Sequence, residues 1–453
     1  MPNPQSAVPA PSLIVISGGQ RSAAPSPRPE SQTRLLKSLP AASRVLQIGA
    51  LDSALERDHR RAHPACEWFA CSALSDAVQG PFDLIVLPDG LHDIADPLAL
   101  LRELARVSGE QTTLVIAVTN QARLAMLRRW VEGDLTDADT GALAQPHLRY
   151  ASAASVYKLL MDAGWMPHLA DASPASVSND AFSAATWAMT DALAIPRATA
   201  QRTLTTEQLV IHAQRRFDAS PVDTGRARFA VVVPTTRESQ LRLNVEHSPG
   251  LQEVDARIVS CRHATSPADA LARALEHCSE DWVLLCHQDV YFPAGFGAQL
   301  QAVLAAVPDA ERDRTLIGFA GIGVNAQTHG YDKAGFVIDR LHRFDHPVSA
   351  AAVSIDEFAV VLSRRSVHRI DPQLGWHLWA TDLCLSAICT HQVFARIVRL
   401  PVFHNSVNDY RLPQAFYDSA ATLAAKHASF GPITTLCGTI DADFLTPARR
   451  AAP

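Results

Sequence analysis

Three polar side chains follow an apolar segment in the second half of the chain. The segment 282–286 is Trp-Val-Leu-Leu-Cys, and His287, Gln288 and Asp289 come directly after it. An apolar run of this length predicts a strand that is buried on both faces. His287 and Asp289 are two residues apart, so on an extended backbone both side chains point to one side. A nitrogen and a carboxylate that converge suit a divalent cation such as Mn²⁺ or Mg²⁺; the alternative is a polar strand end without a ligand.

Strands and helices alternate along two parts of the chain, and they predict the sheets that position these residues. Alternation of this kind indicates an α/β fold class, with parallel strands covered by helices. Ligands bind such sheets at the carboxyl ends of the strands. The expected strands are 44–48, 82–87, 112–118, 229–233, 256–260 and the strand that begins at Trp282, and the expected helices are 97–107, 151–163 and 267–277.

Composition divides the 453 residues into five expected segments. Pro, Ser, Ala and Gln dominate the N-terminus and predict disorder there. Ser, Pro and Asn interrupt the helical stretches between the two α/β parts. The segments are a disordered N-terminus (1–38), a first α/β domain (39–171), a helical connecting region (172–226), a second α/β domain (227–440) and a flexible tail (441–453).

The overall composition is that of a globular protein, with 47% hydrophobic and 19% charged residues. The net charge of −6 argues against a dedicated nucleic-acid binder. The eight cysteines form no CxxC pair, which is typical of core cysteines in a reducing compartment. No apolar segment approaches the ~20 residues that span a bilayer, and no signal peptide is recognisable. We therefore expect a cytoplasmic protein without a transmembrane segment, for which peripheral membrane association stays open.

The second half resembles the family 2-like glycosyltransferases of the GT-A fold, over roughly residues 228–440. The resemblance rests on Val231–Arg237, which is similar to the family's first strand and nucleotide-contacting turn, on the helix from Ser266, and on His287-Gln-Asp, which stands where an Asp-x-Asp is usual. The His-Gln-Asp form is typical of the StrF-like subgroup. The residues that this implies for nucleotide-sugar binding are Pro234, Thr235, Thr236, Arg237, Ser266, His287, Gln288 and Asp289.

The same resemblance implies a metal-assisted, inverting displacement. Asp289 and His287 would hold a divalent cation (Mn²⁺ or Mg²⁺), and His404, which ends another strand, would complete the site. Asp382, in the segment Gly375–Asp382, matches the family's general base, with His377 in reserve. Their alternative roles are a helix cap for Asp382 and a structural hydrogen bond for His404. The segments 318–323 and 331–335 would line the sugar or acceptor pocket, or would simply allow close strand packing.

The first half resembles class I S-adenosylmethionine-dependent methyltransferases, over roughly residues 43–170. Phe82–His92 is similar to the middle of that family and Pro146–Tyr150 to its later His-Leu-Arg loop. The glycine-rich cofactor loop is reduced to Gly49, with Asp52 as a further remnant. We therefore expect a degenerate domain, and S-adenosylmethionine stays open as a second cofactor.

Together these resemblances predict a glycosyltransferase that moves a sugar from a nucleotide-diphosphate sugar to a hydroxyl acceptor. The acceptor would be a glycan precursor, a lipid-linked sugar or a protein. Two alternatives are a bifunctional glycosyltransferase and methyltransferase, and a non-catalytic carbohydrate-binding or assembly protein.

Overall fold

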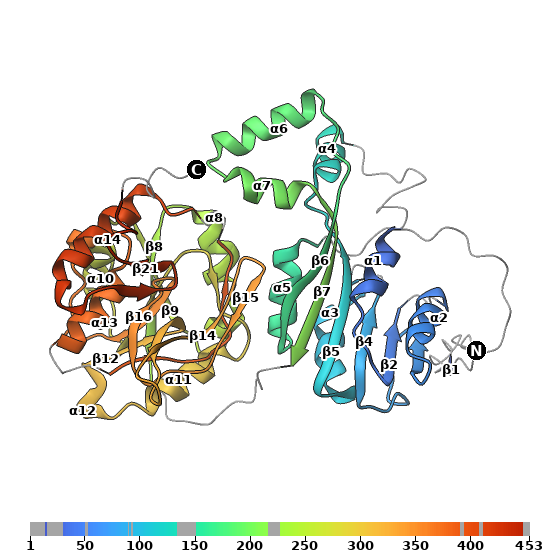
Figure 1. The fold of residues 1–453 in the computed structure, drawn as a ribbon, viewed down its shortest axis with the longest axis horizontal. Coiled ribbons are helices and arrows are strands. Elements are labelled where there is room, and N and C mark those ends of the chain that lie inside the picture. Colours follow the sequence, from blue (N-terminus) through green and yellow to red (C-terminus); the bar gives the residue numbers. More distant parts are fainter. Residues whose placement is uncertain are drawn as a thin grey trace, which may run out of the picture. The chain divides into compact units, whose positions relative to one another are not determined.

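The computed structural model describes residues 14–15, 30–49, 53–88, 90–91, 94–133, 151–215, 227–389, 394–406 and 411–446. The chain forms two compact units, Met1–Asp218 and Ala219–Pro453, and each is a mixed α/β structure (Figure 1). The α/β class expected from the alternation of strands and helices is confirmed for both units.

The first unit is built on a seven-stranded sheet with the order β1-β3-β2-β4-β5-β7-β6. Strands β3, β2, β4 and β5 are parallel, whereas β7 runs antiparallel to both β5 and β6. Apolar residues fill both faces of the central strands. The strands are β1 (Ile14–Val15), β2 (Arg44–Ile48), β3 (Glu67–Cys71), β4 (Phe82–Leu87), β5 (Ser108–Thr119), β6 (Trp165–Pro174) and β7 (Thr206–Arg215).

Two of the five expected segments need correction in this unit. Residues 30–38 lie in the stretch expected to be disordered, but they form α1, in which Leu35 is buried. The expected connecting region 172–226 contains helices α6 and α7, which lie beyond the ends of β6 and β7 (Figure 1), and also strand β7. Apolar residues of β7 pair between β5 and β6 and complete the core. The helices are α1 (Glu30–Ser38), α2 (Ser53–Ala62), α3 (Pro97–Glu103), α4 (Leu124–Glu132), α5 (Ala153–Asp162), α6 (Ala181–Ala192) and α7 (Arg197–Leu204).

The second unit contains a six-stranded sheet with the order β18-β12-β17-β10-β8-β9. In it β8 is parallel to β9 and to β10, so their carboxyl ends lie at one edge. The strands are β8 (Phe229–Thr235), β9 (Arg257–Arg262), β10 (Trp282–Cys286), β12 (Thr315–Gly318), β17 (Ala359–Ser363) and β18 (Phe394–Ile397).

A second sheet of this unit has the order β11-β19-β14-β13-β16, and β15 also pairs with β14. A hairpin of β20 (Ile433–Thr435) and β21 (Gly438–Ile440) follows near the end of the described chain. The strands of the second sheet are β11 (Val290–Tyr291), β13 (Ala320–Val324), β14 (Tyr331–Asp339), β15 (His342–Asp345), β16 (Ala352–Ile355) and β19 (Phe403–His404).

Helices flank the sheets of the second unit and bury two apolar clusters against the six-stranded sheet. Helix α10 follows β9, and its N-cap Ser266 accepts a hydrogen bond from the backbone of Asp269. Within the described residues, no helix is long and apolar enough to cross a membrane. The helices are α8 (Glu238–Leu241), α9 (Pro249–Gln252), α10 (Pro267–Leu275), α11 (Phe296–Ala305), α12 (Asp309–Arg312), α13 (Trp379–Cys389) and α14 (Gln414–Lys426).

Candidate cation and nucleotide-sugar site

The polar residues after β10 lie in a turn and not in a continuing strand. The expected strand that begins at Trp282 ends at Cys286, and the chain turns through 287–289 before it enters β11. The backbone N–H of His287 donates to the carbonyl of Phe358, at the start of the neighbouring β17. The simple same-side argument for His287 and Asp289 was therefore wrong in its mechanism, because a turn, and not an extended backbone, brings the two side chains together.

His287, Asp289 and His404 form a compact cluster. Each offers one ligand atom, and the three atoms lie within 4.8 Å of one another. Strand pairing explains this convergence, because Val290 of β11 is in register with His404 of β19, and the backbone of Asn405 donates to the carbonyl of Asp289. The structure thus brings together the three residues that the sequence singled out for a cation.

His404 is held between two carboxylates. Its Nε2 lies 3.3 Å from Asp289 Oδ1, and its Nδ1 lies 3.1 Å from Asp339 Oδ1. Asp339 ends β14 and is in register with His404 in the parallel pair β14–β19. Burial alone would lower the pKa of His404, but the two carboxylates outweigh it and raise that pKa to about 10. Asp339 fixes which nitrogen of His404 faces the cluster, as carboxylates behind metal-bound histidines commonly do.

The two partners of His404 in the cluster have shifted pKa values of their own. Burial would raise the pKa of Asp289, but His404 lowers it to about 2. Loss of hydration lowers the pKa of His287 to about 4, and the neighbouring His404 contributes in the same direction. His287 is therefore neutral at pH 7, the form that binds metals, whereas His404, with its raised pKa, must release a proton when a cation binds.

The donor set fits a divalent cation that accepts nitrogen ligands. Two imidazoles and one carboxylate give the site less negative charge than a pair of aspartates would. Imidazole nitrogens suit transition metals better than Mg²⁺, which prefers oxygen ligands. Among the expected cations, the residues therefore fit Mn²⁺ better than Mg²⁺, and the coordination positions beyond these three would be filled by ligand oxygens and water.

Gln288 connects this cluster with the end of β8. Its Oε1 accepts hydrogen bonds from the backbone N–H groups of Thr236 (2.9 Å) and Arg237 (2.8 Å), and its Nε2 donates to Thr236 Oγ1. The expected nucleotide turn and the expected cation ligands are thereby held against each other at the carboxyl edge of two parallel strands, where α/β sheets bind ligands.

Three of the other residues expected to bind a nucleotide sugar have structural partners. Thr235 is buried and its hydroxyl donates to the carbonyl of Val233. Pro234 lies within β8, in register with Cys261. Ser266 is buried, and its hydroxyl caps α10. Thr236 and Arg237 are the residues of this turn that stand beyond the strand.

Asp382 does not have the surroundings of an accessible base. It lies in the first turn of α13, its side chain is 1% exposed, and its carboxylate binds His427 Nε2 (2.8 Å) and Lys426 Nζ (3.0 Å). These partners use both oxygens in an internal ion pair. The expected role as general base conflicts with this arrangement. The reserve candidate, His377, packs its ring against Phe416, and burial lowers its pKa.

Asp356 and Glu357 stand at the start of β17, next to the cluster. Asp356 lines a cavity of about 700 Å³ together with His404 and Asp339. Glu357 accepts a hydrogen bond from the backbone of Leu378, and burial together with the adjacent Asp356 raises its pKa to about 8. The neighbouring Phe358 stacks on the ring of His404. The sequence alone does not reveal this position, because nothing in it shows that β17 begins beside β19.

The first unit shows no comparable cluster among its described residues. Gly49 follows β2 with φ 109°, a conformation that favours glycine, so the backbone of a tight loop is retained there. Strand β3 ends in Cys71, which leaves no acid at the end of that strand to hold ribose hydroxyls. Asp52 and the segment Pro146–Tyr150 lie outside the described residues.

Comparisons with known proteins give weak similarities to solved structures of SAM-dependent methyltransferases and to GalNAc-T7. No family model and no curated protein matches the chain. The YcgJ protein of Bacillus subtilis is 13% identical over 42% of this chain and 99% of its own, with a TM-score of 0.26. The N-terminal domain of EvdMO1, solved with SAH and D-fucose, is 17% identical over 45% of this chain and 90% of its own, with a TM-score of 0.25.

GalNAc-T7, solved with UDP, GalNAc and Mn²⁺, is 11% identical. That match covers 39% of this chain and 43% of GalNAc-T7, with a TM-score of 0.27. Similarities at this level say nothing about the function of this chain.

Proposed function

We propose that the second unit is a glycosyltransferase that takes a sugar from a nucleotide-diphosphate donor. The observation that carries this proposal is the cluster of His287, Asp289 and His404, linked through Gln288 to the backbone of the β8 turn. A cation held at the carboxyl edge of two parallel strands, where α/β sheets bind ligands, suits a diphosphate. The GT-A resemblance of the same segments supports this proposal.

The proposed reaction is a displacement at the anomeric carbon of the donor sugar. The acceptor oxygen forms a bond to that carbon while the bond to the diphosphate oxygen breaks, and the acceptor proton goes to a protein base. A bound cation would stabilise the negative charge on the leaving diphosphate. His287, Asp289 and His404 would hold it, and Asp339 would orient His404.

The base that this geometry supports best is Asp356. Its carboxylate faces the cavity that contains His404, and one of its oxygens is fixed by the backbone N–H of Phe358 (3.2 Å). A carboxylate positioned within reach of the acceptor can accept the proton in the transition state. Asp382, tied to Lys426 and His427, is assigned a structural role.

The test is nucleotide binding followed by turnover. The protein is heated with UDP, GDP, dTDP or CMP, each with Mn²⁺, with Mg²⁺ or with a chelator, because a ligand of the folded state raises the melting temperature. We expect one nucleotide to stabilise the protein with Mn²⁺ and less with Mg²⁺. The matching nucleotide sugar should then release nucleotide in the presence of Mn²⁺. The proposal fails if none of the four nucleotides shifts the melting temperature with either cation.

For the first unit we propose a non-catalytic, methyltransferase-like fold. The retained Gly49 and the missing acid at Cys71 support a sheet that kept its framework and lost its cofactor contacts. Calorimetry with S-adenosylmethionine tests this directly. Heat of binding, followed by transfer of a methyl group to the glycosylated product, would favour a bifunctional enzyme instead.

A further inference from the structure

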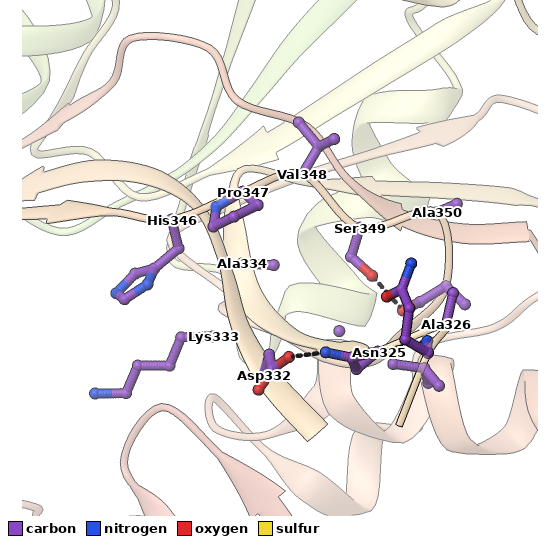
Figure 2. Close-up of a pocket in the computed structure, with 14 residues that line it drawn as sticks. Asn325, Ala326, Asp332, Lys333, Ala334, His346, Pro347, Val348, Ser349 and Ala350 are labelled. Carbon is purple, nitrogen blue, oxygen red and sulfur yellow. Dashed lines mark hydrogen bonds between the residues drawn. The ribbon is translucent and has the colours of Figure 1, made fainter. Parts of the chain in front are cut away.

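Two cavities adjoin each other on the second sheet of the second unit. One, of about 770 Å³, lies between the β13–β14 hairpin and residues 346–351 (Figure 2). The other, of about 700 Å³, contains His404 and Asp356 of the candidate site. Lys333 and His346 line both cavities, so they stand where one passes into the other.

The cavity that contains His404 is rich in cationic and imidazole side chains. Two carboxylates, Asp339 and Asp356, also line it. Asp339 is paired with Arg340 at 2.9 Å, and burial raises the pKa of Asp356. Four cationic side chains thus line the cavity against two carboxylates, and one of the four, Arg343, lies 4.0 Å from Asp345 outside the cavity lining. Besides His404, the cationic and imidazole side chains are Lys333, Arg340, His342, Arg343, His346 and Arg411.

Lys333 is the most informative of these residues. It is exposed, and its ammonium group makes no hydrogen bond or ion pair with any described residue. In Figure 2 the side chains of Lys333 and His346 point to the same side, away from the hydrogen-bonded pair Asn325 and Asp332. A lysine without a carboxylate partner, beside a histidine at the junction of two cavities, is free to contact an anionic ligand.

The basic cavity and the proposed position of the donor diphosphate lie on opposite sides of the His404 ring. His404 turns Nε2 toward Asp289 and the cation cluster, and it turns Nδ1 toward Asp339, which lines the basic cavity. The proposed diphosphate position lies on the Nε2 side, together with Gln288 and the β8 turn. The basic cavity lies on the other side of the same ring and contains the proposed base, Asp356.

We infer that this basic cavity is the acceptor subsite and that the acceptor carries an anionic group, a carboxylate or a phosphate, close to the hydroxyl that receives the sugar. This inference rests on the proposed glycosyl transfer. The anion would be bound by Lys333 and the neighbouring arginines. The larger, less charged cavity would hold the next part of an extended acceptor, whose length the two adjoining volumes accommodate.

The positive charge of the cavity would make this subsite selective for anionic acceptors. An anion between several cations is attracted more strongly in a partly enclosed cavity than in water, because the effective dielectric constant is lower there. A neutral sugar of the same size gains none of this attraction. We therefore expect an anionic sugar to bind at least about tenfold more tightly than a neutral one, which corresponds to about 1.4 kcal/mol.

The experiment is a calorimetric titration of the full-length protein with glucuronate, glucose 6-phosphate and glucose. It is carried out once without additions and once with Mn²⁺ and the nucleotide that gives the largest thermal shift. Tighter binding of glucuronate indicates an acidic sugar, and tighter binding of glucose 6-phosphate indicates a phosphorylated one. Either result, retained in the nucleotide-loaded protein, supports a separate anionic acceptor subsite.

A matched pair of variants assigns the effect to the cavity. Lys333→Gln should weaken binding of the preferred anionic sugar by about fivefold and leave nucleotide binding unchanged. Arg365→Gln, which removes an exposed cation that lines neither cavity, should change neither. The inference is overturned if glucose binds as tightly as both anionic sugars, or if the anionic sugar and the nucleotide displace each other. A failure of the proposed function itself would be seen separately, as the absence of any nucleotide-induced thermal shift.

Discussion

The two units carry parallel strands with equivalent edges and very different chemistry. In the first, Gly49 follows β2 and β3 ends at Cys71, so the carboxyl edge offers a tight loop and a buried thiol. In the second, the corresponding edge of β8 and β10 offers an imidazole, a carboxylate and a bridging amide, and β19 of the other sheet adds the imidazole of His404. The architecture alone therefore predicts where a ligand would bind, whereas the side chains at that edge decide whether one does.

The largest expected effect comes from removing the one carboxylate of the cation cluster. Asp289→Ala should lower the affinity for Mn²⁺ by about a thousandfold, since loss of a residue that only orients a ligand already costs 10 to 100-fold. Mn²⁺-dependent nucleotide binding, measured by calorimetry, should vanish with it. Asp281→Ala is the matched control, because Asp281 precedes the same strand at its other end. Equal loss in both variants would show that the cluster has no special role.

A comparably large effect on stability is expected at Asp382. Asp382→Asn should lower the free energy of unfolding by about 3 kcal/mol, because it leaves Lys426 and His427 without their buried partner. Urea denaturation measures this, and Asp418→Asn, an exposed carboxylate on α14 near this site, should change little. Unchanged stability combined with lost sugar transfer would return Asp382 to the role of base.

A smaller effect is expected behind the cluster, at a residue that contacts no substrate. Asp339→Asn should reduce the Mn²⁺ affinity by about tenfold, because an amide holds His404 Nδ1–H less strongly than a carboxylate. The variant should keep the melting temperature of the metal-free protein within a few degrees. Titration of Mn²⁺ followed by electron paramagnetic resonance measures the affinity. An unchanged affinity would place Asp339 outside the cation site.

The smallest effect concerns a partly buried histidine of the first unit, His212. Burial, with His168 nearby, lowers the pKa of His212 to about 4. The unfolded chain, with an ordinary histidine pKa near 6.5, therefore binds a proton that the folded chain does not. Stability that is present above pH 6.5 should fall by about 1–2 kcal/mol as the pH decreases to 4. His212→Gln should flatten this dependence in urea denaturation curves, and parallel curves for both proteins would contradict it.

Sequence patterns predicted most of the framework because burial leaves a local signature. The strands 44–48 and 82–87 were found with their observed bounds, since continuous apolar runs must be covered on both faces. Strand β7 was missed. Its Thr, Gln and His residues weaken the apolar pattern, and its place in the sheet comes from pairing with β5 and β6, which are distant in sequence.

The site was predictable only where its residues are adjacent to strands. His287, Asp289 and His404 could be named from strand ends, but Asp339 could not, because its role depends on the register between β14 and β19. Asp382 is the opposite case. Its local context matches a base, and its partners, Lys426 and His427, are 44 and 45 residues away.

One consequence follows from the amide of Gln288, which binds two backbone N–H groups of the β8 turn while its chain neighbours contribute to the cation cluster. A single side chain thus makes the turn and the cluster one cooperative unit. Binding at either place removes freedom from the other, so nucleotide and metal should each raise the other's affinity by the same factor. We therefore expect Mn²⁺ and nucleotide to bind more tightly together than either binds alone.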